Sequence, residues 1–150
     1  MAKTLGYMIT WTTYGTWLQG DQRGYVKDGI IYPENANLLQ SNKNMQIQDE
    51  IRLSKIQQQI VREAIIKEAQ SQDQQIFALS VNATHVHIVA ENNAKPISNI
   101  VAYYKKASRF ALKSIGHEGK LWTKGYDKRF CFDKKTLQRR IKYVQNQNQW

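Results

Sequence analysis

The pattern of apolar and polar positions predicts short strands separated by amphipathic helices. Residues 7–12 alternate with a period of two, which is typical of a strand. Residues 46–70 carry apolar side chains at steps of three and four, which predicts a helix lying on a sheet. Residues 76–81 and 84–90 are β-prone apolar runs separated by a turn. The first part of the chain therefore predicts strand, helix, strand and strand.

The rest of the pattern adds a helix, a strand and a last helix. Pro96 opens a helix over about 97–114, residues 129–132 form a short strand, and Asp133 is a good N-cap for a helix from 134 to about 149. This order predicts an α+β fold: a ferredoxin-like or RRM-like antiparallel sheet with helices on one face and a C-terminal helix that carries Tyr143. Residues 25–44 lack a clear period, so we expect an irregular segment within one domain of residues 1–150.

The charge balance narrows the class of partner. The chain has 22 Lys and Arg against 12 Asp and Glu, a formal net charge of +10. This excess favours a polyanion, and we expect nucleic acid and no membrane, because no basic helix with a bulky apolar face stands out. The single cysteine, Cys131, cannot form an internal disulfide, and no signal peptide is recognisable, so we expect a cytoplasmic protein.

Two histidines in the sequence Thr84-His85-Val86-His87-Ile88-Val89 are the first candidates for chemistry. In a strand, His85 and His87 point to the same side about 7 Å apart, which suits one metal ion or one phosphate. A buried pair that only backbone groups satisfy is an equally open interpretation. Structural zinc is disfavoured by the lack of further cysteines, and a histidine-triad hydrolase by valine at position 89. Nucleophile-elbow, P-loop and dinucleotide motifs are absent, so we expect no nucleotide cofactor.

A ladder of positive charge lies on the predicted helix 97–114. Lys105, Arg109 and Lys113 are spaced four apart, with Tyr103 and Lys106 nearby. Most charge ladders are simply solvated faces. Here every charge is positive and an aromatic residue stands among them, which is more typical of binding to a phosphate backbone and an unstacked base.

These features together resemble the single-tyrosine His-hydrophobe-His (HUH) transposases, namely the small insertion-sequence transposases and the REP-associated tyrosine transposases. The histidine sequence resembles their central motif, and a basic helix with Tyr104-Lys105-Lys106 follows it. Two later stretches are also similar to the family, Leu121-Trp122-Thr123-Lys124-Gly125-Tyr126 and Tyr143-Val144-Gln145-Asn146-Gln147. The opening strand with Tyr14-Gly15-Thr16-Trp17 resembles one branch. The resemblance spans nearly the whole chain outside residues 25–44.

The resemblance implies a metal-dependent DNA transposase. His85 and His87 would bind Mg²⁺ or Mn²⁺, with Gln147 as the third ligand. Tyr143 would attack the scissile phosphate of single-stranded DNA, giving a 5′-phosphotyrosine and a free 3′-hydroxyl. Because a phenol with a pKa near 10 is a poor nucleophile, Arg139, one helical turn earlier, would stabilise the phenolate. Tyr103 and Tyr104 are rival nucleophiles that lack a glutamine four residues on.

The family also implies a homodimer that recognises imperfect DNA hairpins and cuts beside them during transposition. The DNA-binding residues would then be Tyr103, Lys105, Lys106, Arg109 and Lys113. One alternative is a non-catalytic or domesticated protein of the same fold that binds DNA hairpins. Another is a small RNA-binding ferredoxin-like protein, which would need the strand aromatics on an open sheet face.

Overall fold

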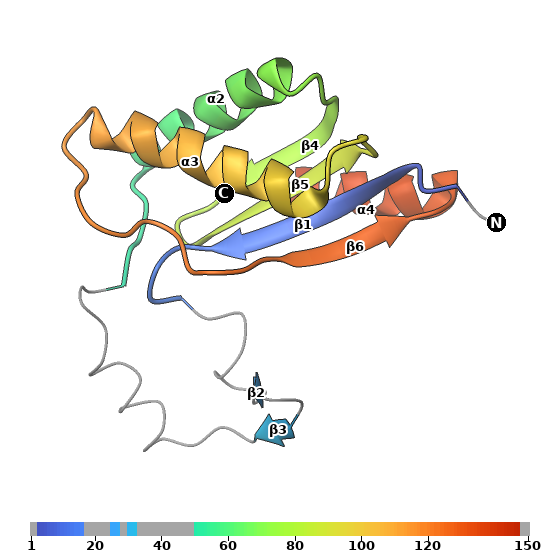
Figure 1. Cartoon of the computed structure of the whole chain (residues 1–150), viewed down its shortest axis with the longest axis horizontal. Helices are drawn as coiled ribbons and strands as arrows, with labels where there is room; N and C mark the ends of the chain where they lie inside the picture. The colour runs from blue at the N-terminus through green and yellow to red at the C-terminus, as the bar shows by residue number, and fades with distance from the viewer. Residues whose placement is uncertain (1–2, 17–24, 28–29, 33–49, 148–150) are drawn as a thin grey trace.

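A four-stranded antiparallel sheet forms the centre of the molecule. The structure is a computed structural model and describes residues 3–16, 25–27, 30–32 and 50–147. The strands are β1 (Gly6–Thr12), β4 (Ile76–Val81), β5 (His85–Glu91) and β6 (Asp127–Cys131), in the spatial order β4-β5-β1-β6 (Figure 1). Helix α2 (Lys55–Ser71) connects β1 to β4, and α3 (Ile97–Lys113) connects β5 to β6. This is the ferredoxin-like arrangement, with α4 (Lys134–Asn146) added, so the predicted fold class is confirmed.

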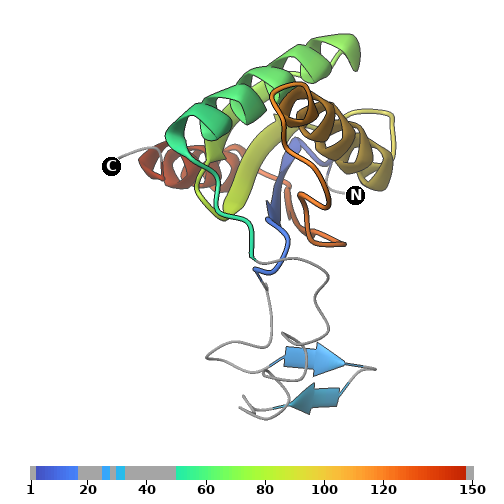
Figure 2. The ribbon, with the colours of Figure 1, turned by 90° about the vertical axis from the view of Figure 1, so that its left-hand side faces the viewer.

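Helices cover both faces of the sheet. Figures 1 and 2 show α2 and α3 side by side on one face. There Tyr7, Ile9 and Trp11 of β1 join the main core with residues of both helices. The alternate residue Met8 faces the other way and packs with Val144 of α4. Every residue of β1 is therefore buried, because the period of two presents each of them to one covered face or the other.

The start of α2 differs from the prediction. The helix begins at Lys55 and not near residue 46, since Ser54 forms a capping box with Gln57. Leu53 is buried ahead of the helix, whereas Ile56 is 72% exposed. The buried residues of α2 are Gln58, Val61, Ile65 and Ala69. Residues 46–49 lie outside the described residues. By contrast, α4 begins at Lys134 behind Asp133, whose carboxylate accepts a hydrogen bond from the Thr136 backbone, as predicted.

A short hairpin lies where we expected an irregular segment. Strands β2 (Tyr25–Lys27) and β3 (Ile30–Tyr32) pair antiparallel with each other. The prediction is wrong for these residues, because strands of three residues are too short to show a readable period. Residues 33–44 of the same segment are outside the described residues. None of the helices in the described ranges has the length and apolar character needed to cross a membrane.

Candidate active site

The two histidines of β5 lie on the sheet face that α4 covers. In the register of the sheet, His87 is opposite Thr10 and His85 is opposite Thr12 of β1. Along β5, the two histidines alternate with Val86 and Ile88, which are fully buried in the core beneath α2 and α3. The imidazole rings are 4.8 Å apart between centroids and are nearly perpendicular. The two side chains therefore form a compact pair on the α4 side of the sheet.

Helix α4 brings Tyr143 to this pair. Val144 is fully buried against Met8 and Val89, which fixes the helix on the sheet. The preceding residue, Tyr143, places its ring 5.8 Å from the His87 ring, at an interplanar angle of 76°. Its side chain stays 47% exposed. A phenol that solvent can reach and a histidine pair thus meet within one chain.

Hydrogen bonds define which imidazole nitrogens are engaged. The Nδ1 atom of His87 is 2.8 Å from the Thr10 hydroxyl oxygen, which is buried. The Nε2 atom of His85 accepts a hydrogen bond from the Asn82 amide nitrogen at 2.9 Å. Because Nε2 accepts, the proton of neutral His85 lies on Nδ1, which donates to the Thr84 hydroxyl at 3.2 Å. Thr10 and Asn82 therefore orient the pair, and neither was identified from the sequence.

Burial keeps both imidazoles neutral. Desolvation lowers the pKa of His87 to about 4, and the neighbouring His85 lowers it further, while Asp127 acts in the opposite direction. Desolvation also lowers the pKa of His85. Neutral imidazoles have a lone pair for a cation, whereas imidazolium does not. At neutral pH the pair is in the protonation state that metal binding needs.

The residues present fit a divalent ion that has open positions. Within the described residues, no cluster of three His, Cys, Asp or Glu side chains is arranged to hold a metal. Among the described residues, a third protein ligand would be a group of another type, such as an amide oxygen. Gln147 caps the C-terminus of α4, one turn beyond Tyr143, and is half-buried. Imidazole nitrogens with an amide oxygen suit Mn²⁺ better than Mg²⁺, which prefers oxygen throughout.

The predicted phenolate-stabilising residue and the two rival nucleophiles lie in different parts of the fold. Arg139 is exposed on α4, one turn before Tyr143, and interacts electrostatically with Asp133. The rival nucleophile Tyr104 is fully buried, and its hydroxyl donates a hydrogen bond to Gln74. Burial also raises the Tyr104 pKa. Tyr103 is 39% exposed but belongs to α3, on the sheet face opposite the histidines.

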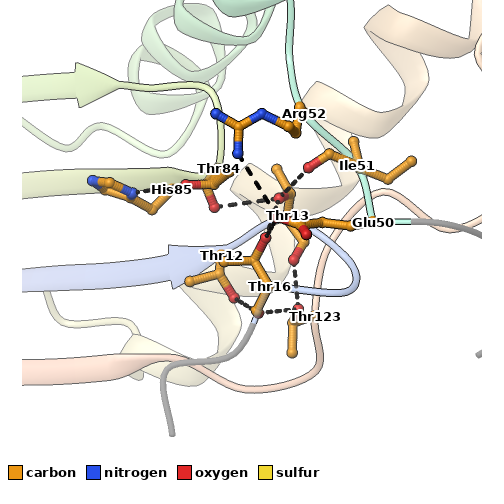
Figure 3. Close-up of polar contacts among 9 residues, drawn as sticks. All are labelled: Thr12, Thr13, Thr16, Glu50, Ile51, Arg52, Thr84, His85 and Thr123. Atoms are coloured by element: carbon orange, nitrogen blue, oxygen red, sulfur yellow. Dashed lines mark hydrogen bonds and ion pairs between the residues drawn. The ribbon is translucent and has the colours of Figure 1, made fainter. Parts of the chain in front are cut away.

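A junction of threonines fixes the backbone beside His85 (Figure 3). The Thr13 hydroxyl lies between the carbonyl oxygens of Ile51, at 2.7 Å, and Thr84, at 3.3 Å. From the other side, the Thr123 hydroxyl donates to the carbonyl oxygens of Thr13, at 2.7 Å, and Thr16, at 3.1 Å. These hydrogen bonds join the end of β1, the start of β5 and two loops. They therefore hold in place the backbone next to His85, the first residue of β5.

Four of the five predicted DNA-binding residues line a groove on the α3 side of the sheet. The groove has a volume of about 1410 Å³, between α3 and the segment 117–124. Lys105, Lys106, Arg109 and Lys113 all line it, and Tyr103 does not. Lys105 is half-buried, and its ammonium group donates to the carbonyl oxygens of Thr123, at 3.0 Å, and Gly125, at 2.7 Å. Lys105 therefore braces one wall of the groove.

Comparison with known proteins places the chain among transposases. The family model described as "Transposase IS200 like" matches residues 41–147. No curated protein matches the chain. The fold is similar to that of a REP-associated tyrosine transposase bound to a REP hairpin, with a TM-score of 0.54 and 14% identity over 96% of this chain and 67% of that one. It is also similar to a Deinococcus radiodurans R1 protein provisionally designated a transposase, with a TM-score of 0.50 and 16% identity over 100% of this chain and 95% of that one. Since the family model covers well over half of the sequence, the chain belongs to the IS200-like transposase family.

Proposed function

We propose that the protein is a metal-dependent endonuclease and strand transferase that acts on single-stranded DNA during transposition of an element with hairpin ends. The observation that carries the proposal is the contact between Tyr143 and His87, whose rings are 5.8 Å apart. A nucleophile must reach solvent to meet a DNA phosphate, and the Tyr143 side chain is 47% exposed.

The reaction is a transfer of one phosphoester bond. The Tyr143 oxygen attacks phosphorus, the bond between phosphorus and the 3′ oxygen breaks, and that oxygen takes up a proton to become a 3′-hydroxyl. The 5′-phosphate remains on tyrosine, which preserves the bond energy for rejoining to another 3′-hydroxyl. Arg139, one turn before Tyr143, would stabilise the phenolate by its charge.

His85, His87 and Gln147 would hold the divalent ion. When bound, Mn²⁺ or Mg²⁺ would act as a Lewis acid and a template for the phosphate oxygens. The chain's own contribution would be orientation: with His87 in the tautomer whose Nδ1–H donates to the Thr10 hydroxyl oxygen, the Nε2 lone pair would be left for the ion. The low pKa of His87, about 4, keeps this nitrogen available well below neutral pH.

Binding of a DNA hairpin is proposed for the cationic side of α3. Lys106, Arg109 and Lys113 line the groove there, and a protein of similar fold has been solved with a REP hairpin. The groove and Tyr143 lie on opposite faces of the sheet, so hairpin and scissile strand would contact different sides of the molecule. We propose that the protein forms a homodimer, as the family resemblance implies. In it, Tyr143 would act together with the histidine pair of its own chain.

The aromatic residues of β1 do not support the RNA-binding alternative. It would need strand aromatics on an open face, as in sheets that stack bases. Tyr7 and Trp11 are instead fully buried beneath α2 and α3.

A covalent-adduct assay tests the proposal. Protein and Mn²⁺ are mixed with hairpin DNA that has a single-stranded flank labelled at its 3′ end, because that fragment carries the new 5′-phosphate. We expect a labelled protein band on a denaturing gel, lost in Tyr143→Phe and in His87→Ala and retained in the matched control Tyr103→Phe. Hairpin binding without an adduct, across a library of flanking sequences, would instead indicate the non-catalytic DNA-binding protein.

A further inference from the structure

The groove beside α3 has a composition that the proposed cleavage reaction does not explain. The residues that line it include the apolar Phe110, Leu121 and Trp122. Cations line the groove from two segments: Lys106, Arg109 and Lys113 from α3, and Lys120 and Lys124 from the facing segment 117–124. Among the described residues that line the groove, Glu118 is the one acidic residue. A lining that combines apolar side chains with cations from α3 and from the facing segment fits a ligand that has both flat apolar and anionic parts.

Among the described residues, no acidic side chain forms an ion pair with Arg109, Lys113 or Lys124. The ion pairs among the described residues are Arg52–Glu50 and Arg129–Asp127, and neither is in the groove. Arg109, Lys113 and Lys124 therefore present unpaired charge within the part of the chain that the structure describes. Such charge attracts phosphate and makes binding depend on salt.

Aromatic rings stand beside these cations. Phe110 is 56% exposed, with the Lys106 ammonium 5.7 Å from its ring centroid. The Tyr14 ring has the Lys120 ammonium 5.3 Å from its centroid. Trp122 is held in place, because its indole N–H donates to the Lys105 carbonyl at 3.2 Å and the Ser108 hydroxyl at 3.0 Å. Exposed rings next to lysines are the usual means of binding unpaired bases.

We propose that this groove binds a short run of unpaired DNA nucleotides, with bases on Phe110 and Tyr14 and phosphates on Arg109, Lys113 and Lys124. A duplex would leave the exposed Phe110 ring without a partner, because its base faces are already stacked on each other. The groove volume of about 1410 Å³ exceeds the roughly 300–1,000 Å³ of a pocket for a drug-sized ligand, so more than one nucleotide fits. The choice of DNA rests on the proposed function.

The position of the groove gives the unpaired nucleotides bound there a role separate from cleavage. α3 packs on the sheet face opposite the histidines, so nucleotides in the groove are not the ones that Tyr143 attacks. The groove would hold an unpaired loop, bulge or flank of the substrate and so position the hairpin relative to the scissile strand.

Fluorescence anisotropy of the whole protein in EDTA tests the proposal without cleavage. The probes are labelled dT10, a ten-base-pair duplex and rU10. For Phe110→Ala we expect about 5-fold or greater loss of dT10 affinity, since stacking contributes about 1–3 kcal/mol per base, and little change for the duplex. The matched control is Phe132→Ala, an exposed phenylalanine that does not line the groove and should bind as the wild type does. For Arg109→Gln the slope of log affinity against log salt should fall by about 0.7.

Three outcomes would overturn the proposal. The first is full dT10 affinity of Phe110→Ala in a protein whose thermal unfolding is unchanged, and the second is an equal loss of dT10 and duplex binding in that variant. Tighter binding of rU10 than of dT10 would identify RNA as the ligand instead. The proposed function is tested separately: with Phe110→Ala and Tyr143→Phe, groove binding and adduct formation are scored in different assays, so either can fail alone.

Discussion

At the scale of single residues, the candidate site depends on side chains that orient the histidines. The sequence indicated His85, His87 and Tyr143, because strand alternation and the family resemblance both select residue types. It did not indicate Thr10 or Asn82. Thr10 meets His87 only through the register between β1 and β5, which separates them by 77 positions, and no local pattern reports such a pairing. Orienting residues at this distance become visible only once the sheet is built.

The depressed pKa of His87 predicts a loss of stability in acid. The unfolded chain binds this proton near pH 6.5, and the folded protein only near pH 4, so unfolding takes up a proton between these values. The free energy of unfolding should therefore fall as pH falls through this window, by up to about 3 kcal/mol. Urea unfolding at pH 7 and pH 4 measures this change. His87→Gln, which does not titrate, should show a smaller fall; an equal fall in both proteins would contradict the assignment.

The Asn82 amide occupies the His85 lone pair that a metal ion would use. Its hydrogen bond to Nε2 must break on binding, and such a bond contributes about 0.5–1.5 kcal/mol. Asn82→Ala should therefore raise Mn²⁺ affinity about 2- to 10-fold in calorimetric titration. Asn93→Ala is the matched control, because that amide bonds to the Gln72 carbonyl and not to the histidines. Weaker Mn²⁺ binding by Asn82→Ala would mean that Asn82 itself helps to hold the ion.

At the scale of elements, the helices and strands with strong local signals were predictable. The alternation in β1 and the Asp133 cap of α4 mark those elements closely. The start of α2 was not predictable from apolar spacing, because Leu53 and Ile56 continue the pattern across the real boundary at Ser54. The capping-box residues Ser54 and Gln57 were the signal that was present and not used. Local chemistry at helix ends locates a boundary better than apolar periodicity does.

The docking of α4 should be necessary for the proposed reaction. Val144 is its one fully buried residue and lies next to Tyr143. We expect Val144→Ala to lower the free energy of unfolding by about 1–3 kcal/mol and to loosen the contact between Tyr143 and His87. Adduct formation should fall at a temperature where the protein remains folded by circular dichroism. Unchanged adduct formation would show that helix docking does not position the tyrosine.

At the scale of the whole molecule, the sheet separates two functional surfaces. The histidine pair and Tyr143 lie under α4, and the cationic groove lies beside α3. Both residue sets were predictable from the sequence, but their placement on opposite faces of the sheet was not. The sequence also grouped Lys105 with the phosphate-binding residues, whereas its ammonium group holds the carbonyls of Thr123 and Gly125. Which lysine faces ligand and which braces a loop depends on the folded chain.

This separation predicts that DNA affinity and metal affinity can be changed independently. The double variant Arg109→Gln, Lys113→Gln should weaken hairpin binding about 10-fold near physiological salt, because two phosphate contacts are lost. Its Mn²⁺ affinity should match the wild type. His87→Ala should give the reverse result: weak Mn²⁺ binding with hairpin affinity retained. A loss of Mn²⁺ affinity in the groove variant, or of hairpin affinity in His87→Ala, would contradict two separate surfaces.

The identity of the modified tyrosine is the most direct test of the account. Trypsin cuts after Lys142 and releases residues 143–150, whereas Tyr103 and Tyr104 fall in the separate peptide 68–105. After reaction with Mn²⁺ and hairpin DNA and digestion of the DNA, mass spectrometry should find nucleotide phosphate on the 143–150 peptide alone. The same modification on peptide 68–105, or on neither peptide despite DNA cleavage, would contradict Tyr143 as the nucleophile.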